Sequence, residues 1–422
     1  MSSSYHRLYA VLGAGALIGL TGKAQASNWN FLPRIEVGGT YNDNFRLAQD
    51  SADKTAVYGP YIDASFDASL LNQLSKLEIV PRVHSTYFPS DRPDDSTDGY
   101  LDIDGEHKTL KSDYTLQAHY ANESVIYSEL LPATFPGVAL GQVVGGTSGR
   151  VATRNRRQLE QVTPAFTHDL TQRSHLDLEG KYDHATFSKS QLQQVGFTNY
   201  GGLAGWRYDI TPREDIRING IASRFLPARG GHDTNRYGAE FQWDTQPTQI
   251  MRFYARVGAQ RTEAKTSIGT IGATGVTGGA GVVWNYPLTQ VVLDVLRAIS
   301  PSSAGAEVTD DEVRFRLLHA FRPRFSGYLA FRGVRLRGAS SQQALAVQGE
   351  DYVAAETGVE YQITESYRVA LAYDYTWQRF QGEPNAASNA ARVSLIYQPL
   401  NRFEPLPEFT GVPQGLAQDI QE

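Results

Sequence analysis

Charged residues recur at every second position in two parts of this 422-residue chain. Asp102, Asp104 and Glu106 alternate with apolar or small residues, and Arg314 and Arg316 flank a phenylalanine in the same way. Alternate side chains of a β-strand lie on one face, so each set predicts a row of like charge. Such rows attract counter-ions and orient polar solutes without making or breaking covalent bonds.

Covalent catalysis is less well supported. A hydrolase of the serine type needs a histidine beside a serine and an acid, and the histidines after residue 26 are scattered. They are His84, His107, His119, His168, His175, His184, His232 and His319. The sequence contains no cysteine, metal-ligand spacing, phosphate loop or dinucleotide fingerprint. We expect no enzyme, no cofactor and no metal, and keep an outer-membrane hydrolase as a minor alternative.

The elements that position the charged rows are alternating segments. From Asn199 to Ile210, aromatic, apolar and small residues alternate with mostly polar or small ones, and the pattern returns at 237–243, 369–377 and 393–397. One face of each predicted strand is therefore apolar and the other polar. Aromatic residues crowd the ends of the apolar faces, which is typical of strands that contact a lipid bilayer.

The N-terminal residues resemble a secretion signal. Arg7 precedes an apolar run from Leu8 to Leu20, and Ala24-Gln25-Ala26 forms a small-residue cleavage site. The run is shorter than the roughly 20 residues that a membrane-spanning helix needs. We predict a signal peptide over 1–26, and the formal charge of −6 for the whole chain argues against a nucleic-acid partner.

Short and long connections alternate along the chain, which predicts strand number. The short, turn-like ones lie at 71–75, 109–112, 169–174, 211–214, 245–249, 287–290, 321–324 and 364–366. The longer ones lie near 47–55, 88–98, 128–153, 187–197, 225–234, 262–274, 300–307, 338–350 and 380–388. This alternation predicts about 18 strands, with 16 as the alternative. An even number returns both ends of the barrel to the periplasm, with the long loops outside.

Strands can cross hydrocarbon only as a closed ring, because every backbone amide and carbonyl must be paired. The predicted fold is therefore an all-β, up-and-down antiparallel transmembrane barrel over 27–398, with a periplasmic tail over 399–422. Two details are less regular. The apolar phase shifts at Gly333, which predicts a bulge, and Asp294 is expected to point inward although its strand is apolar on both faces.

Several short motifs resemble β-barrel porins of Gram-negative outer membranes, of the kind associated with exopolysaccharide and exosortase systems. The motifs are Trp29-Asn30-Phe31, Pro33, Tyr41-Asn42-Asp43-Asn44, Pro164 with Asp169-Leu170-Thr171-Gln172-Arg173, and Arg297 with Ser300-Pro301-Ser302 and Gly305. None is catalytic. Such barrels commonly finish on an aromatic residue, whereas this chain continues beyond Tyr397. The resemblance implies a location in the cell outer membrane, contact with the barrel assembly machinery and outer-membrane lipids, and a polysaccharide or other hydrophilic solute.

The strand registers predict which charged residues face the lumen. The acidic ones, in the first third of the chain, are Asp63, Asp67, Glu78, Asp102, Asp104 and Glu106. The basic ones, about half a circumference away, are Arg207, Arg217, Arg236, Arg252, Arg256, Arg314, Arg316, Arg368 and Arg392. Opposed walls of this kind would place a field across the lumen. The alternative is a structural network in which arginines and carboxylates only satisfy one another.

These features favour a passive outer-membrane channel for hydrophilic solutes, with export of an exopolysaccharide implied by the resemblance alone. The longest loop, 129–153, is the third external one. By resemblance to general porins it folds inward as a constriction; the alternative is a mobile surface loop. The competing function is a closed barrel that acts as a scaffold or receptor through its external loops.

Overall fold

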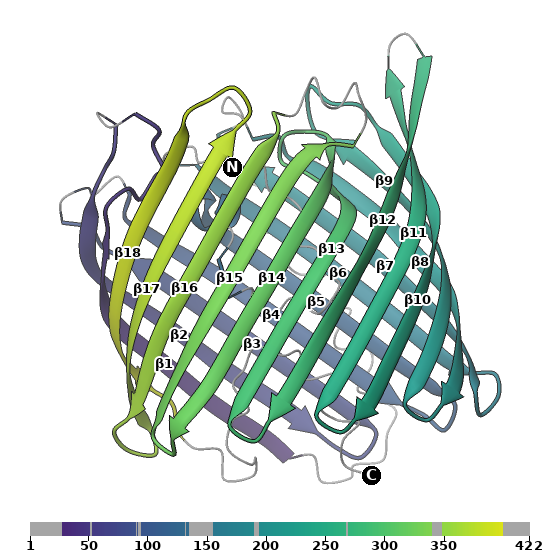
Figure 1. Cartoon of the computed structure of the whole chain (residues 1–422), viewed down its shortest axis with the longest axis horizontal. Helices are drawn as coiled ribbons and strands as arrows, with labels where there is room; N and C mark the ends of the chain where they lie inside the picture. Colours follow the sequence, from purple (N-terminus) through teal and green to yellow (C-terminus); the bar gives the residue numbers. More distant parts are fainter. Residues whose placement is uncertain are drawn as a thin grey trace, which may run out of the picture.

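The structure is a computed structural model that describes residues 28–50, 53–89, 91, 94–130, 132–134, 155–189, 194–266, 269–339 and 348–399. These residues form one 18-stranded antiparallel sheet that closes on itself (Figure 1). The strands are β1 (Asn28–Asn42), β2 (Val57–Leu71), β3 (Ser75–Thr86), β4 (Ser96–Lys108), β5 (Ser112–Ser124), β6 (Arg156–Asp169), β7 (Ser174–Phe187), β8 (Phe197–Thr211), β9 (Glu214–Pro227), β10 (Thr234–Thr248), β11 (Met251–Thr266), β12 (Gly269–Tyr286), β13 (Thr289–Pro301), β14 (Glu307–Arg322), β15 (Phe325–Gly338), β16 (Glu350–Gln362), β17 (Tyr367–Phe380) and β18 (Asn385–Tyr397).

Closure follows from simple neighbour pairing. Each strand pairs with the strands before and after it in sequence, and β1 also pairs with β18. The up-and-down barrel of 18 strands is thus confirmed, and the alternative of 16 is wrong. The predicted signal peptide and most of the predicted tail lie outside the described residues.

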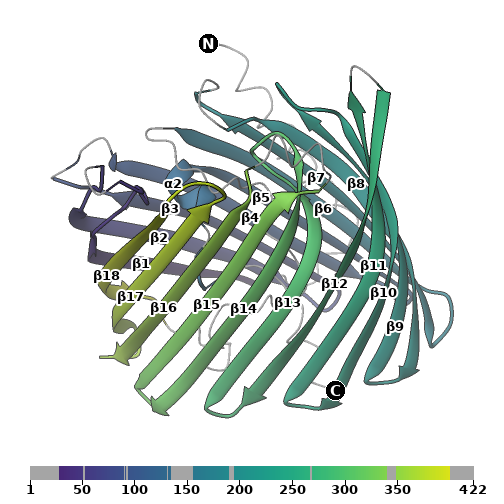
Figure 2. The same cartoon turned by 45° about the horizontal axis from the view of Figure 1, so that its top comes forward.

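Among the described residues, one short helix, α2 (Val125–Glu129), follows β5 (Figure 2). In the described part of the chain, no helix is both long enough and apolar enough to span a membrane.

Short turns lie at one end of the barrel and the longer connections at the other (Figure 1). All eight predicted short turns are present, with ends within a few residues of the prediction. The long loop predicted near 262–274 is wrong, because β11 and β12 continue through this region and pair up to Thr266 and Gly269. Backbone pairing between β11 and β12 holds this Gly- and Thr-rich segment as a hairpin, which projects beyond the rim (Figure 1).

The outer surface of the barrel is apolar. On β17, Leu371 is 55% exposed and Val369 and Tyr373 are also exposed, while Ala372 between them is buried on the inner face. The same alternation holds for β1, where Phe31, Ile35 and other apolar side chains are exposed. A closed ring of strands with an apolar exterior is the arrangement that hydrocarbon requires. The chain is therefore an outer-membrane β-barrel.

The bulge predicted at Gly333 is wrong. β15 keeps an unbroken register with β14 from Gly338 to Ser326, and Gly333 pairs with Val313. The apolar phase shifts because Val334 and Leu336 point inward and are buried beneath the loop end, while Arg335 points outward. The shift in the apolar pattern therefore reflects the apolar contacts of the inner face of β15 near the loop end, and the backbone of the strand stays regular.

Candidate functional site

The candidate site is the inner face of the barrel. Directly paired residues on neighbouring strands share a face, so the register fixes which side chains point inward. Asp63 on β2 pairs with Glu36 on β1 and with His84 on β3, and all three lie opposite the exposed apolar side chains. Extending this register around the ring places the predicted acidic and basic residues on the inner face of their strands.

The six predicted acidic residues lie on three neighbouring strands, β2 to β4. Asp63 accepts hydrogen bonds from Arg82 at 2.6 Å and from His84 at 3.0 Å. Glu78 pairs with Lys76, and Glu106 with Lys108, at 3.1 and 2.9 Å. Asp102 contacts His119, Asp104 lies directly between Glu78 and Gln117, and Asp67 lies opposite Leu32. This sector is acidic, with local partners that offset part of its charge.

The nine predicted arginines alternate with carboxylates along the rest of the ring. Seven of them have an ion pair: Arg217 with Asp215, Arg236 with Glu307, Arg252 with Asp244, Arg256 with Glu240, Arg314 with Asp294, Arg368 with Glu360, and Arg392 with Glu356 and Asp374. Arg207 lies directly opposite Arg217, and Arg316 opposite Val292. This side of the interior is therefore an interleaved network of both signs rather than a purely basic wall.

The arginines differ in their access to water. The side chain of Arg252 is 35% exposed and that of Arg392 is 39% exposed, so solvent reaches both inside the ring. Arg314 is only 1% exposed, and its guanidinium donates a hydrogen bond to Asp294. The predicted inward direction of Asp294 is confirmed, and Tyr254 also donates to it.

A buried charged cluster beside Arg314 has no counterpart in the predicted site residues. It consists of Arg332, Glu312, Asp310 and Glu307, all nearly inaccessible to solvent. The nitrogen Nε of Arg332 lies 2.5 Å from Glu312. Strict alternation from Phe331 places Arg332 inward with or without a bulge at Gly333, so the signal for this residue was present in the sequence.

The connection after β5 turns into the barrel. Ile126 on α2 packs with Phe45, Val57 and Phe88 near the ends of β2 and β3. Tyr127 stacks edge-on against His84 at 5.4 Å, and burial raises the pKa of its phenol to about 12, so the hydroxyl stays neutral. The described part of this connection thus lies inside the ring (Figure 2).

The same connection also contacts a second part of the wall. Leu130 and Ala133 pack with Val308, Val334 and Tyr352 on the inner face of β14 to β16. An apolar layer therefore extends from the wall of β2 to that of β15 near the loop end. The predicted inward fold agrees with residues 125–130 and 132–134, and most of 129–153 lies outside the described residues.

Ser303, in the connection between β13 and β14, is where three connections meet. Its hydroxyl lies 3.1 and 3.2 Å from the two carboxylate oxygens of Glu129 and donates to them. Its carbonyl accepts a hydrogen bond from the amide of Val195, in the connection after β7, at 2.6 Å. Ser303 and Glu129 are both buried. The mouth of the barrel is therefore narrowed by segments that are hydrogen-bonded to one another across it.

Four histidines lie near the short-turn end of the barrel. His107, His168 and His319 each contact a single hydroxyl, that of Ser75, Ser112 or Thr289, at 2.8 Å near the short-turn end. His175 lies between Asp169 and Asp209 at the same end. Within the described ranges, no group of three or more His, Asp or Glu side chains is arranged to hold a metal ion.

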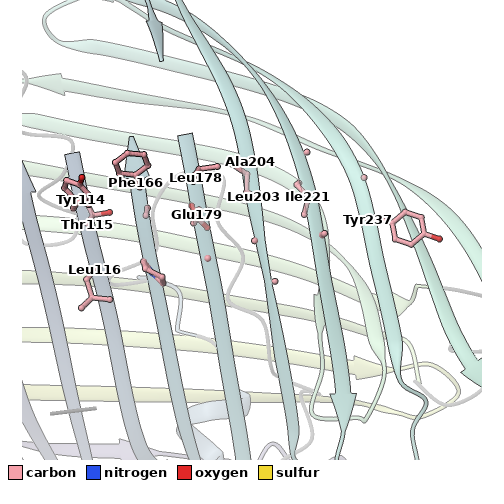
Figure 3. Close-up of a pocket in the computed structure, with 18 residues that line it drawn as sticks. Tyr114, Thr115, Leu116, Phe166, Leu178, Glu179, Leu203, Ala204, Ile221 and Tyr237 are labelled. Atoms are coloured by element: carbon pink, nitrogen blue, oxygen red, sulfur yellow. The ribbon is translucent and has the colours of Figure 1, made fainter. Parts of the chain in front are cut away.

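An apolar groove of about 1160 Å³ lies across β5 to β10 (Figure 3). The residues that line it include Tyr114, Phe166, Leu178, Ala204 and Tyr237. Tyr114, Leu178 and Tyr237 are exposed, so these positions belong to the outer face. The groove is part of the lipid-facing surface and is separate from the charged interior.

No family model and no curated protein matches the chain. Among solved structures, it is similar to OccK2 (OpdF) of Pseudomonas aeruginosa, with 11% identity, a TM-score of 0.46, and coverage of 88% of this chain and 99% of that one. It is also similar to the outer membrane protein OpdK of Pseudomonas aeruginosa, with 10% identity, a TM-score of 0.42, and coverage of 87% and 98%. A third is OccAB3 of Acinetobacter baumannii, with 11% identity, a TM-score of 0.42, and coverage of 87% and 99%. At these identities no site residue is carried over.

Proposed function

We propose that the barrel is a channel for small hydrophilic solutes and that the segments joined at Ser303 set its narrowest part. The observation that carries this proposal is the solvent access of charged side chains inside the ring, as for Arg252 and Arg392. A ring of 18 strands is too wide for its own side chains to fill, so water occupies the space they leave.

The chemistry of the wall favours polar cargo. Arginine and carboxylate side chains alternate around the interior, and both hydrogen-bond well to hydroxyl and carboxylate groups. An apolar solute would have to displace water from these groups without replacing the lost hydrogen bonds. Export of a polysaccharide chain rests on the family resemblance alone, and the hydrogen-bonded mouth favours smaller solutes.

Single-channel recording in planar bilayers tests the proposal. The wild-type protein should conduct, and Ser303→Ala should raise conductance or its fluctuations, because the hydroxyl that holds Glu129 across the mouth is removed. Ser366→Ala, in a short turn at the opposite end, is the matched control and should conduct like the wild type. A folded wild-type barrel that never conducts would reject the channel and favour the scaffold function. Unchanged conductance in Ser303→Ala would place the narrowest part elsewhere.

A further inference from the structure

Five charged residues form a continuous row on the outer face of neighbouring strands β13 to β17. Each is the direct register partner of the next, and the signs alternate: Arg297, Asp311, Arg335, Asp351 and Arg379. We call these residues the charged row. Figure 1 shows the five strands side by side in one wall. The charged row lies toward the ends of the strands that carry the long connections.

The next set of paired residues toward the short-turn end is apolar. It consists of Val295, Val313, Gly333, Val353 and Trp377, which are also direct register partners. Two residues of strand separate this set from the charged row, a distance of about 7 Å. The boundary between apolar surface and charge is therefore abrupt across the whole sector.

The arginines of the charged row keep donors available. Their side chains are 54%, 53% and 54% exposed for Arg297, Arg335 and Arg379. Arg335 and Arg379 each donate one hydrogen bond to the same carboxylate, that of Asp351, at 2.7 Å. A guanidinium has five N–H groups, so each arginine has further donors besides the one bonded to Asp351.

The sector carries more positive than negative charge. Three arginines face two aspartates in the charged row, and the exposed Arg337 lies one step further out on β15. Among the described residues, no carboxylate forms an ion pair with Arg337. Elsewhere on the outer face, Arg224 with Asp233 and Arg261 with Glu263 are balanced pairs.

We propose that the charged row binds the phosphate groups of a lipid in the outer leaflet, whose acyl chains lie against the apolar set below it. Only an amphiphile contacts both surfaces at once, because its phosphate lies at the hydrocarbon boundary and its chains lie beneath. Guanidinium groups bind phosphate oxygens through paired N–H donors, and basic residues at a membrane surface attract anionic headgroups. The phosphate groups that bind belong to the lipid, and free phosphate ions are not the ligand. This proposal depends on the membrane orientation and not on the channel function.

The test uses the full-length purified barrel in detergent, with bisphosphorylated lipid A as the probe and native mass spectrometry or thermophoresis as the readout. The variant Arg335→Gln/Arg379→Gln should bind about tenfold more weakly or worse, as expected for the loss of two cation–phosphate contacts. The matched control Arg224→Gln/Arg261→Gln, in the balanced pairs, should bind like the wild type. Binding of the wild type should also weaken as salt rises.

A second variant separates recognition from structural support. Asp351→Asn removes the carboxylate that two arginines share, so it should strengthen lipid A binding. If the charged row served only to join the strands, Asp351→Asn would not strengthen lipid A binding. Equal binding by wild type and the double arginine variant would overturn the proposal, as would displacement of lipid A by millimolar inorganic phosphate or equal binding of dephosphorylated lipid A.

Discussion

Tyr328 lies directly across from Gly358, and its hydroxyl donates a hydrogen bond to Glu356 at 2.6 Å. A Cβ at position 358 would lie 2.5 Å from the ring of Tyr328, so only glycine leaves room for it. Tyr61 lies over Gly38 in the same way, with its hydroxyl 2.7 Å from Glu36. Inward tyrosines thus fill the space above a paired glycine and reach a carboxylate beyond it.

Gly358→Ala should destabilise the barrel by about 1–3 kcal/mol, because the ring must move and its hydrogen bond to Glu356 is lost. Thermal unfolding, followed by the loss of the folded band in gels or by circular dichroism, measures the effect. Gly99→Ala is the control, since a Cβ there meets nothing within 4 Å. Equal shifts for the two variants would contradict the steric argument.

Leu371→Arg should cost about 2–4 kcal/mol if the residue lies near the bilayer midplane, because it puts a charge in lipid. The neighbouring Ala370 faces inward between Glu360 and Ser394, so Ala370→Arg should be mild. Unfolding in liposomes compares the two. A milder effect for Leu371→Arg would reverse the assignment of faces.

Replacing Arg252 and Arg256 with glutamine should shift ion selectivity toward cations. Their ion pairs, 3.5 Å to Asp244 and 3.9 Å to Glu240, are loose and partly exposed, so folding should be little affected. Reversal potentials in a salt gradient report the change. Arg213→Gln, in the short turn after β8, is the control, and an unchanged reversal potential in the double variant would remove these arginines from the ion path.

Arg314→Gln should instead lower stability, by about 3–5 kcal/mol, because it takes one partner from a buried ion pair. Arg314 lies between the carboxylates of Asp294 and Glu312, which are themselves buried. The double variant Arg314→Gln/Asp294→Asn should recover part of the folded yield. If Arg314→Gln alone were as stable as the wild type, the ion pair would have to be accessible to water inside the barrel.

Alternation along each strand was enough to predict the strands and their faces, because lipid imposes one rule on every second residue. The number of strands followed from the alternation of short and long connections. The rule on every second residue placed Arg252 and Asp63 inward. It could not show that Arg314 is buried and Arg252 exposed, since that depends on which distant segments cover each position. The contact between Ser303 and Glu129 was unpredictable for the same reason, because 174 residues separate them and neither follows a pattern.

The predictions of a bulge at Gly333 and of a long loop near 262–274 were wrong for related reasons. Val334 and Leu336 face inward by the strand register. They are apolar because the connection after β5 covers that part of the wall. Glycine and threonine in 262–274 were interpreted as loop residues, yet each finds a backbone partner on the neighbouring strand. The composition of a segment does not show whether it packs against a distant part of the chain or pairs with the strand across a turn.

The closure of the ring between β1 and β18 is also its shortest described junction. Eight residues of β1, from Ile35 to Asn42, pair with β18, whereas β1 pairs with β2 along its full length of 15 residues. Among the described residues, Asn28 to Arg34 have no partner on the β18 side. Fewer hydrogen bonds hold this junction than hold the neighbouring one, so we expect it to separate before the others on heating.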